Sequence, residues 1–165
     1  MRGYLPLIFA GLAVVGCSKS APAPTPVPIP YTVGWTSDGI VLSTQGWLTS
    51  SGGVGNGQLG MPTIWVAGRI REGGNAGTAV ELEMPPAVGT YVFGPTSPAW
   101  GTYQVNAVKY YAGTAPGITG APGSGSITVT KLTSGTINGT FIFTGVNPAT
   151  GATKTIANGT FYVPK

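Results

Sequence analysis

The sequence lacks histidine altogether and carries a single cysteine, Cys17, among its 165 residues. Without histidine, the chain cannot build a Ser-His-Asp or Cys-His catalytic arrangement, nor most zinc and iron sites. Only 7% of the residues are charged, and the acids are Asp38, Glu72, Glu81 and Glu83. These scarcities predict a protein that is not an enzyme and that needs neither a metal nor a cofactor.

Glu81 and Glu83 are the one pair of acids whose spacing suits a catalyst. Two residues apart on a strand, they lie roughly 7 Å from each other at ordinary strand rise, a separation comparable with that of glycosidase carboxylates. Acids that neighbour each other on an exposed strand more commonly belong to the solvent-facing side of a sheet. A calcium site would need several more converging oxygens. The pattern therefore favours a structural interpretation of this pair.

The longest apolar run near the N-terminus, Leu5 to Val15, is too short to cross a bilayer as a helix. It follows the basic residue Arg2 and leads to Gly16, a small residue before Cys17. A basic start, a short apolar core and a small residue at the cleavage point are typical of a secretory signal. Residues 1–16 are thus predicted to be a signal peptide that is removed.

A cysteine directly after that small residue resembles the bacterial lipobox, where the cysteine becomes the diacylated N-terminus. The resemblance implies that Cys17 is the lipid attachment site, carrying palmitate-type acyl chains, although Val14 stands where the lipobox more often has leucine. The alternative is an ordinary signal peptide whose apolar core ends in cysteine. An unpaired thiol is unusual in an oxidising compartment, so lipidation is the favoured interpretation.

Residues 17–30 read as a tether behind that anchor. Prolines alternate with small residues at positions 22, 24, 26, 28 and 30. Proline fixes φ and lacks an N–H, so alternating proline favours an extended strap that cannot join a sheet. At about 3.1 Å per residue, the strap would hold a domain roughly 40 Å from the lipid surface. Residues 31–165 are then predicted to form one domain.

Period-two alternation runs through that domain and predicts an all-β fold. Val80, Leu82 and Met84 point one way while Glu81 and Glu83 point the other, which indicates a half-buried strand. Similar alternation covers residues 64–70, 126–130 and 136–144, with turn-forming glycines and prolines between the runs. We expect an antiparallel β-sandwich or flattened barrel of about eight strands, with little or no helix.

A Gly-Thr-aromatic motif occurs four times along these strands. It stands at Gly89–Tyr91, Gly101–Tyr103, Gly139–Phe141 and Gly159–Phe161, and an asparagine precedes the last two. In the final strand the apolar face changes parity, which predicts a β-bulge near Asn158–Gly159. We interpret the repeats as having a structural role in the strands and turns.

Several of these segments resemble a known group of proteins. The stretches Gly125–Leu132, Ile137–Gly145 and Thr155–Phe161 are similar to the closing hairpins of small Bacteroidetes-type lipoproteins, whose β-sandwich domain has no known function. Gly89–Tyr91 and Ala107–Tyr111 resemble its middle strands. The resemblance implies a β fold and an envelope location, and it transfers no catalytic residue.

Trp47, Trp65 and Trp100 are candidates for a ligand surface, because aromatic rings aligned on a sheet can stack on sugars or pack against a partner. Trp65 alternates with Ile64 and Val66, which places it on the outward face. The alternative is that most of these rings fill the core of the sandwich.

Two functions follow as hypotheses. The first is a membrane-anchored envelope lipoprotein with a structural or protein-interaction role, and the second is a carbohydrate-binding module on a lipid anchor. Basic residues are spread along the domain without interleaved aromatics, so nucleic-acid binding is not indicated. Ser18 and Lys19 after the lipid cysteine do not resemble an inner-membrane retention signal. The sequence therefore favours the outer membrane, and it is compatible with anchoring in either the periplasmic or the surface leaflet.

Overall fold

The computed structural model describes the chain except for residues 1–30, 45–48, 57–60, 71–76, 116 and 119–122. The predicted signal peptide, Cys17 and the tether lie outside the described residues. All regular elements in the described part of the chain are β-strands. Among these residues there is accordingly no helix long and apolar enough to span a membrane. The strands are β1 Thr32–Ser37, β2 Ile40–Ser43, β3 Thr49–Asn56, β4 Pro62–Ile70, β5 Thr78–Met84, β6 Gly89–Val92, β7 Trp100–Val105, β8 Val108–Gly113, β9 Ser124–Leu132, β10 Thr136–Val146 and β11 Thr153–Pro164.

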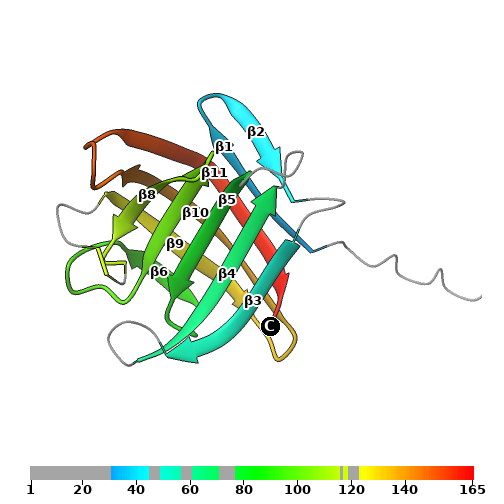
Figure 1. Ribbon diagram of the computed structural model, residues 1–165. Helices are drawn as coiled ribbons and strands as arrows, with labels where there is room; N and C mark the ends of the chain where they lie inside the picture. The colour runs from blue at the N-terminus through cyan, green and yellow to red at the C-terminus, as the bar shows by residue number, and fades with distance from the viewer. Residues whose placement is uncertain (1–30, 45–48, 57–60, 71–76, 116, 119–122) are drawn as a thin grey trace, which may run out of the picture.

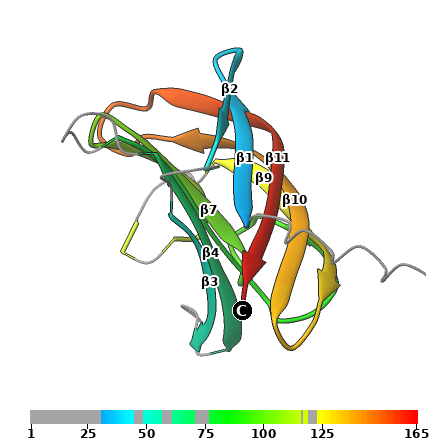
Figure 2. The same cartoon turned by 90° about the vertical axis from the view of Figure 1, so that its right-hand side faces the viewer.

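The strands form one curled antiparallel sheet with two facing layers. The first layer has the order β2-β1-β11-β10-β9-β6 and the second β3-β4-β5-β7-β8. The layers join where Val146 of β10 pairs with Tyr111 of β8. Figure 2 shows β3, β4 and β7 facing β1, β9, β10 and β11, and in Figure 1 the strands of the two layers cross steeply. This half-barrel or sandwich-like architecture confirms the predicted fold class.

The described chain holds eleven strands where the sequence suggested about eight. β2 and β6 have only four residues each, too few to display an alternation that can be recognised in the sequence. β3 is rich in serine and glycine and has no apolar stripe. Short or glycine-rich strands take their position from the neighbours they pair with, so they become visible only in the folded chain.

The core lies between the two layers and follows the predicted alternation. In β5, Val80, Leu82 and Met84 are fully buried while Glu81 and Glu83 are partly exposed on the opposite face. Burying one such aliphatic side chain stabilises the fold by roughly 1.5–3 kcal/mol. The largest fully buried side chains in the described chain are Trp35, Phe143, Ile64, Leu82, Met84, Ile127, Ile137, Ile156, Val33, Val66, Val80 and Val129.

Two Asn-Gly-Thr-Phe segments pair with each other at the centre of the first layer. Gly139 of β10 lies opposite Phe161 of β11, and Phe141 lies opposite Gly159. Each phenylalanine ring occupies the space that a side chain on the opposite glycine would need: a Cβ on Gly139 would lie 2.3 Å from the Phe161 ring, and one on Gly159 2.5 Å from Phe141. The two rings stack with centroids 6.4 Å apart. The sequence repeat is thus a reciprocal glycine–aromatic contact.

An ion pair connects the β1–β2 turn with the start of β11 at one end of the first layer. Lys154, in β11, donates a hydrogen bond to the carboxylate of Asp38 in the β1–β2 turn. Asp38 adopts a φ of 52°, a left-handed conformation that aspartate tolerates better than most residues. The hydrogen bond raises the pKa of Lys154 above its ordinary value. Both side chains are exposed to solvent to a considerable extent, so the pair fixes the position of the turn more than it stabilises the fold.

We expect Gly139→Ala to destabilise the domain by about 3 kcal/mol, because the new methyl group would overlap both the Phe161 ring and the backbone oxygen of Thr128, only 2.2 Å away. Gly135→Ala is the matched control: no atom lies within 4 Å of its Cβ position, and its stability should change by less than about 0.5 kcal/mol. Urea unfolding followed by tryptophan fluorescence measures both. Equal midpoints for the two variants would contradict the reciprocal packing.

Candidate functional site

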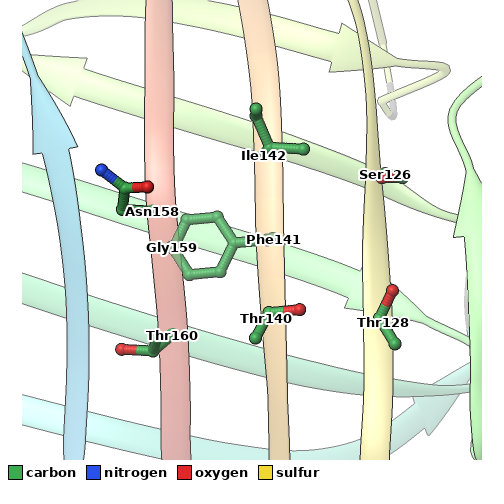
Figure 3. A pocket seen from close by; sticks show the side chains of 8 residues that line it. All are labelled: Ser126, Thr128, Thr140, Phe141, Ile142, Asn158, Gly159 and Thr160. Atoms are coloured by element: carbon green, nitrogen blue, oxygen red, sulfur yellow. The ribbon is translucent and has the colours of Figure 1, made fainter.

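Four threonines form a straight row across the outer face of the first layer. Thr90 of β6 lies opposite Thr128 of β9, Thr128 opposite Thr140 of β10, and Thr140 opposite Thr160 of β11. Because directly opposite residues of antiparallel strands share a face, all four side chains point away from the core. Figure 3 shows three of them, Thr128, Thr140 and Thr160, side by side on adjacent strands. The strands thus place four hydroxyl and methyl groups at regular intervals.

A shallow open hollow of about 500 Å³ lies over three threonines of this row, Thr128, Thr140 and Thr160. Its lining residues are Ser126, Thr128, Thr140, Phe141, Ile142, Asn158, Gly159 and Thr160 (Figure 3). The hollow coincides with the predicted bulge, which the structure confirms: the β10–β11 register shifts between Phe141 and Phe143. Asn158 takes a φ of 51° there, a left-handed conformation that accommodates the extra residue of β11 at the bulge.

The groups around the hollow are hydroxyls, one amide and an aliphatic side chain. Thr90 and Thr128 share a hydrogen bond of 2.9 Å between their Oγ1 atoms. Within the described residues, Thr140 and Thr160 make no side-chain hydrogen bond, so their hydroxyls face solvent with full donor and acceptor capacity. No acid or base adjoins them in the hollow, and a hydroxyl without a base is a weak nucleophile. The arrangement suits binding.

The aliphatic side chains on this outer face are unusually accessible. Ile142, beside the threonine row, is 52% exposed, and Val92 of the edge strand β6 is 68% exposed. Val92 lies opposite Ser126, which in turn lies opposite Ile142, so the three form a second row parallel to the threonines. The face as a whole combines hydroxyl groups with apolar groups and contains no charged residue in either row.

The threonine row was not predicted from the sequence, although a signal for it was present. Thr90, Thr140 and Thr160 are the middle residues of three of the four Gly-Thr-aromatic repeats. The repeat places glycine and the aromatic ring on the inner face and the threonine on the outer face. In the fourth repeat, Thr102 belongs to β7 in the other layer and is buried. The repeat therefore indicated three of the four threonines, but only the pairing of the strands brings these side chains into one row.

The three tryptophans predicted as a ligand surface do not form one exposed group. Trp65 points outward from β4 and is 36% exposed, as its alternation suggested. Trp100 is only 9% exposed, so its predicted place on an open surface is wrong; β7 is buried on both faces at that end. Trp47 lies outside the described residues. Trp65 is thus the one described tryptophan whose ring is available at the surface.

The two acids of β5 have different environments. Arg69 of β4 donates to Glu81 Oε1 at 2.6 Å. Glu83 lies between Trp65 and Trp100 in the strand register, and its Oε1 is buried without a hydrogen-bond partner in the described part of the chain. The described residues contain no cluster of three Cys, Asp, Glu or His side chains of the kind that holds a metal ion.

Comparison with known proteins identifies a family and no individual relative. A family model described as a domain of unknown function, DUF6252, matches residues 70–164. The matched segment begins at the end of β4 and includes β5 through β11, and therefore all four threonines of the row. No curated protein matches the chain. No solved structure matches it either.

Acrylamide quenching should distinguish the tryptophans. In a Trp47→Phe background, we expect Trp65→Phe to remove most of the quenchable emission, because Trp35 and Trp100 are buried and Trp65 is not. Trp100→Phe in the same background is the control and should leave the quenchable fraction nearly unchanged. Stern–Volmer plots of the variants measure the effect. A larger loss in the Trp100 variant than in the Trp65 variant would contradict the placement of the two rings.

Proposed function

The chain belongs to the DUF6252 family, because the matched residues 70–164 exceed half of its length, and from that premise we propose that it is the head of an exported envelope lipoprotein that binds a protein partner. The family description assigns no activity, so the proposal draws on the chain's own residues. It has two parts: a lipid anchor at Cys17, and an interaction surface on the outer face of the first layer.

The anchor is supported by the order of residues 1–30 and by the position at which the head begins. A basic residue, a short apolar core and Gly16-Cys17 match a lipoprotein signal, as in the small Bacteroidetes-type lipoproteins that the sequence resembles. The outer membrane is the proposed location. Tyr31, the residue before β1, is exposed, with its ring 5.3 Å from that of Tyr162. A strap attached ahead of Tyr31 therefore leaves from the surface of the head.

The interaction surface is supported by one observation above all: the broad face around the threonine row has no charge in its two rows and exposes Ile142 and Val92. Protein interfaces are depleted in charged residues at their centre, and their polar groups form hydrogen bonds across the contact. Thr140 and Thr160 supply such groups beside Ile142. A partner with an uncharged, partly apolar surface fits this face.

Cys17→Ala tests the anchor. We expect the wild-type protein to incorporate a palmitate analogue in its bacterial host and to partition into the detergent phase, because each buried CH₂ of an acyl chain contributes about 0.8 kcal/mol to membrane binding. The Cys17→Ala protein should lose the label and partition into water. Ser18→Ala is the control and should behave like wild type. Mass spectrometry that finds an unmodified Cys17 thiol in the purified native protein would refute this part of the proposal.

Site-specific photocrosslinking tests the interaction surface. A benzoylphenylalanine residue at position 142 should give a discrete adduct in intact cells, and Thr140→Lys should weaken it roughly tenfold, because burying an unpaired charge opposes association. The same photoreactive residue at Val108, which is exposed on β8, is the control and should give no such adduct. Equal adducts at both positions, or an adduct that Thr140→Lys leaves unchanged, would rule out the proposed face.

A further inference from the structure

Strand β2 is an open edge of the first layer. Within the part of the chain that the structure describes it pairs with β1 alone, and the tip of the β1–β2 hairpin stands clear of the other strands in Figures 1 and 2. Its neighbouring residues Ile40 and Val41 are 62% and 80% exposed. Successive side chains of a strand point to opposite faces, so only a partner that lies alongside the edge can cover both of them.

The backbone groups that face outward along this edge follow from the pairing of β2 with β1. The Thr44 N–H donates to the Val33 carbonyl at 2.9 Å, and the register continues without a shift along β2. In an antiparallel ladder, alternate residues bond to the same neighbouring strand, so Leu42 bonds inward to β1. The N–H and C=O groups of Val41 and Ser43 therefore point out from the edge of the sheet.

β2 carries none of the features that usually protect a sheet edge. Natural edge strands are protected by charged side chains, by proline or by a β-bulge. The segment Ile40–Ser43 contains no charged residue and no proline, and its pairing with β1 has no bulge. Asp38, the acid just before β2, is paired with Lys154. The edge is therefore neutral and geometrically ready to accept a further strand.

We propose that β2 pairs with β2 of a second copy of this chain, so that the two first layers join into one antiparallel sheet. A two-fold axis at Leu42 places Val41 opposite Ser43 of the second copy, and Ser43 opposite its Val41. Of the antiparallel registers, this one alone uses the outward N–H and C=O groups of both residues in both copies. The contact is isologous, as in most homodimers.

The charge distribution around β2 suits a second copy in particular. An isologous contact brings the same surface patch of two molecules together, so a charged residue near its axis would meet its own like charge. β2 has no charge. In the proposed register the two Asp38 side chains lie at opposite ends of the joined strands, each beside its own Lys154. No like charges therefore face each other across the contact.

This contact is independent of the proposed protein-binding face. β2 and β6 are the two opposite edges of the first layer, and the threonine row begins at β6 and ends at β11. β1 lies between β11 and β2. A dimer formed through β2 therefore leaves the threonine row, Ile142 and Val92 accessible, and it doubles the number of binding faces in one assembly.

Disulfide formation in native membranes that carry the full chain tests the register. Leu42→Cys places a thiol on the two-fold axis, where opposite Cβ atoms lie about 4.5 Å apart, close enough for a disulfide. We expect a dimer linked through position 42 of both copies, identified by peptide mapping. Co-expressed Val41→Cys and Ser43→Cys chains, each changed at an exposed position, should link mainly to each other. The wild type, whose one cysteine is Cys17, should give neither linkage.

Val41→Pro tests the outward backbone groups. Proline removes the N–H that faces the second copy but no bond to β1, because edge strands tolerate proline whose nitrogen points away from the sheet. We expect it to weaken dimerisation roughly tenfold, measured by light scattering of the detergent-solubilised full chain. Val92→Pro is the matched control and should leave the dimer unchanged: the Phe93 N–H bonds inward to Gly125, so the Val92 N–H also points outward, at the other edge.

Three results would overturn the β2 dimer. The first is a chain of monomeric mass that also forms neither of the two engineered disulfide linkages. The second is a dimer that Val41→Pro and Val92→Pro weaken equally, or that neither affects. The third is a thiol at position 42 that links only to a different protein, because the edge would then receive a foreign strand and not a second copy.

Discussion

The reciprocal contact between two glycines and two phenylalanines is the constraint on which the first layer depends. Gly139 and Gly159 leave room above the sheet, and Phe161 and Phe141 fill it. Glycine alone weakens a strand, since it adds backbone entropy and packs no side chain. An aromatic ring from the neighbouring strand recovers the lost contact and fixes the register, because a slip of one residue would place each ring opposite a threonine or an asparagine. The pairing of β10 with β11 is therefore specific despite the glycine content.

That same register determines what the outside of the sheet presents. When Gly139 and Phe141 face inward, Thr140 between them must face outward, and the same holds for Thr160. The glycine–phenylalanine contact on the inner face and the threonine row on the outer face thus both result from the alternation of side chains along β10 and β11. The bulge at Asn158 lies in the same place, since Asn158 and Gly159 line the hollow. Packing of the core and shape of the candidate surface are consequences of the same short repeat.

Much of the fold could be predicted from local sequence, and the candidate sites could be predicted only in part. Strands with one buried face, such as β5 and β10, show period two, and Trp65 could be placed outward for that reason. Trp100 could not, because β7 is buried on both sides at that point and its alternation carries no information. The difference between Glu81 and Glu83 depends on Arg69, which reaches Glu81 from the neighbouring strand. Contacts between strands distant in sequence have no local signature.

The position of β1 has a mechanical consequence. β1 is paired on both sides, with β2 and with β11, and its first residue Thr32 lies opposite Tyr162 near the end of β11. A force applied to the chain ahead of Tyr31 would act along β1, so the hydrogen bonds of both ladders would be loaded together in shear and could not be broken one after another. A head pulled from this end would resist extraction of its first strand more strongly than a head pulled from a hairpin at the sheet's edge.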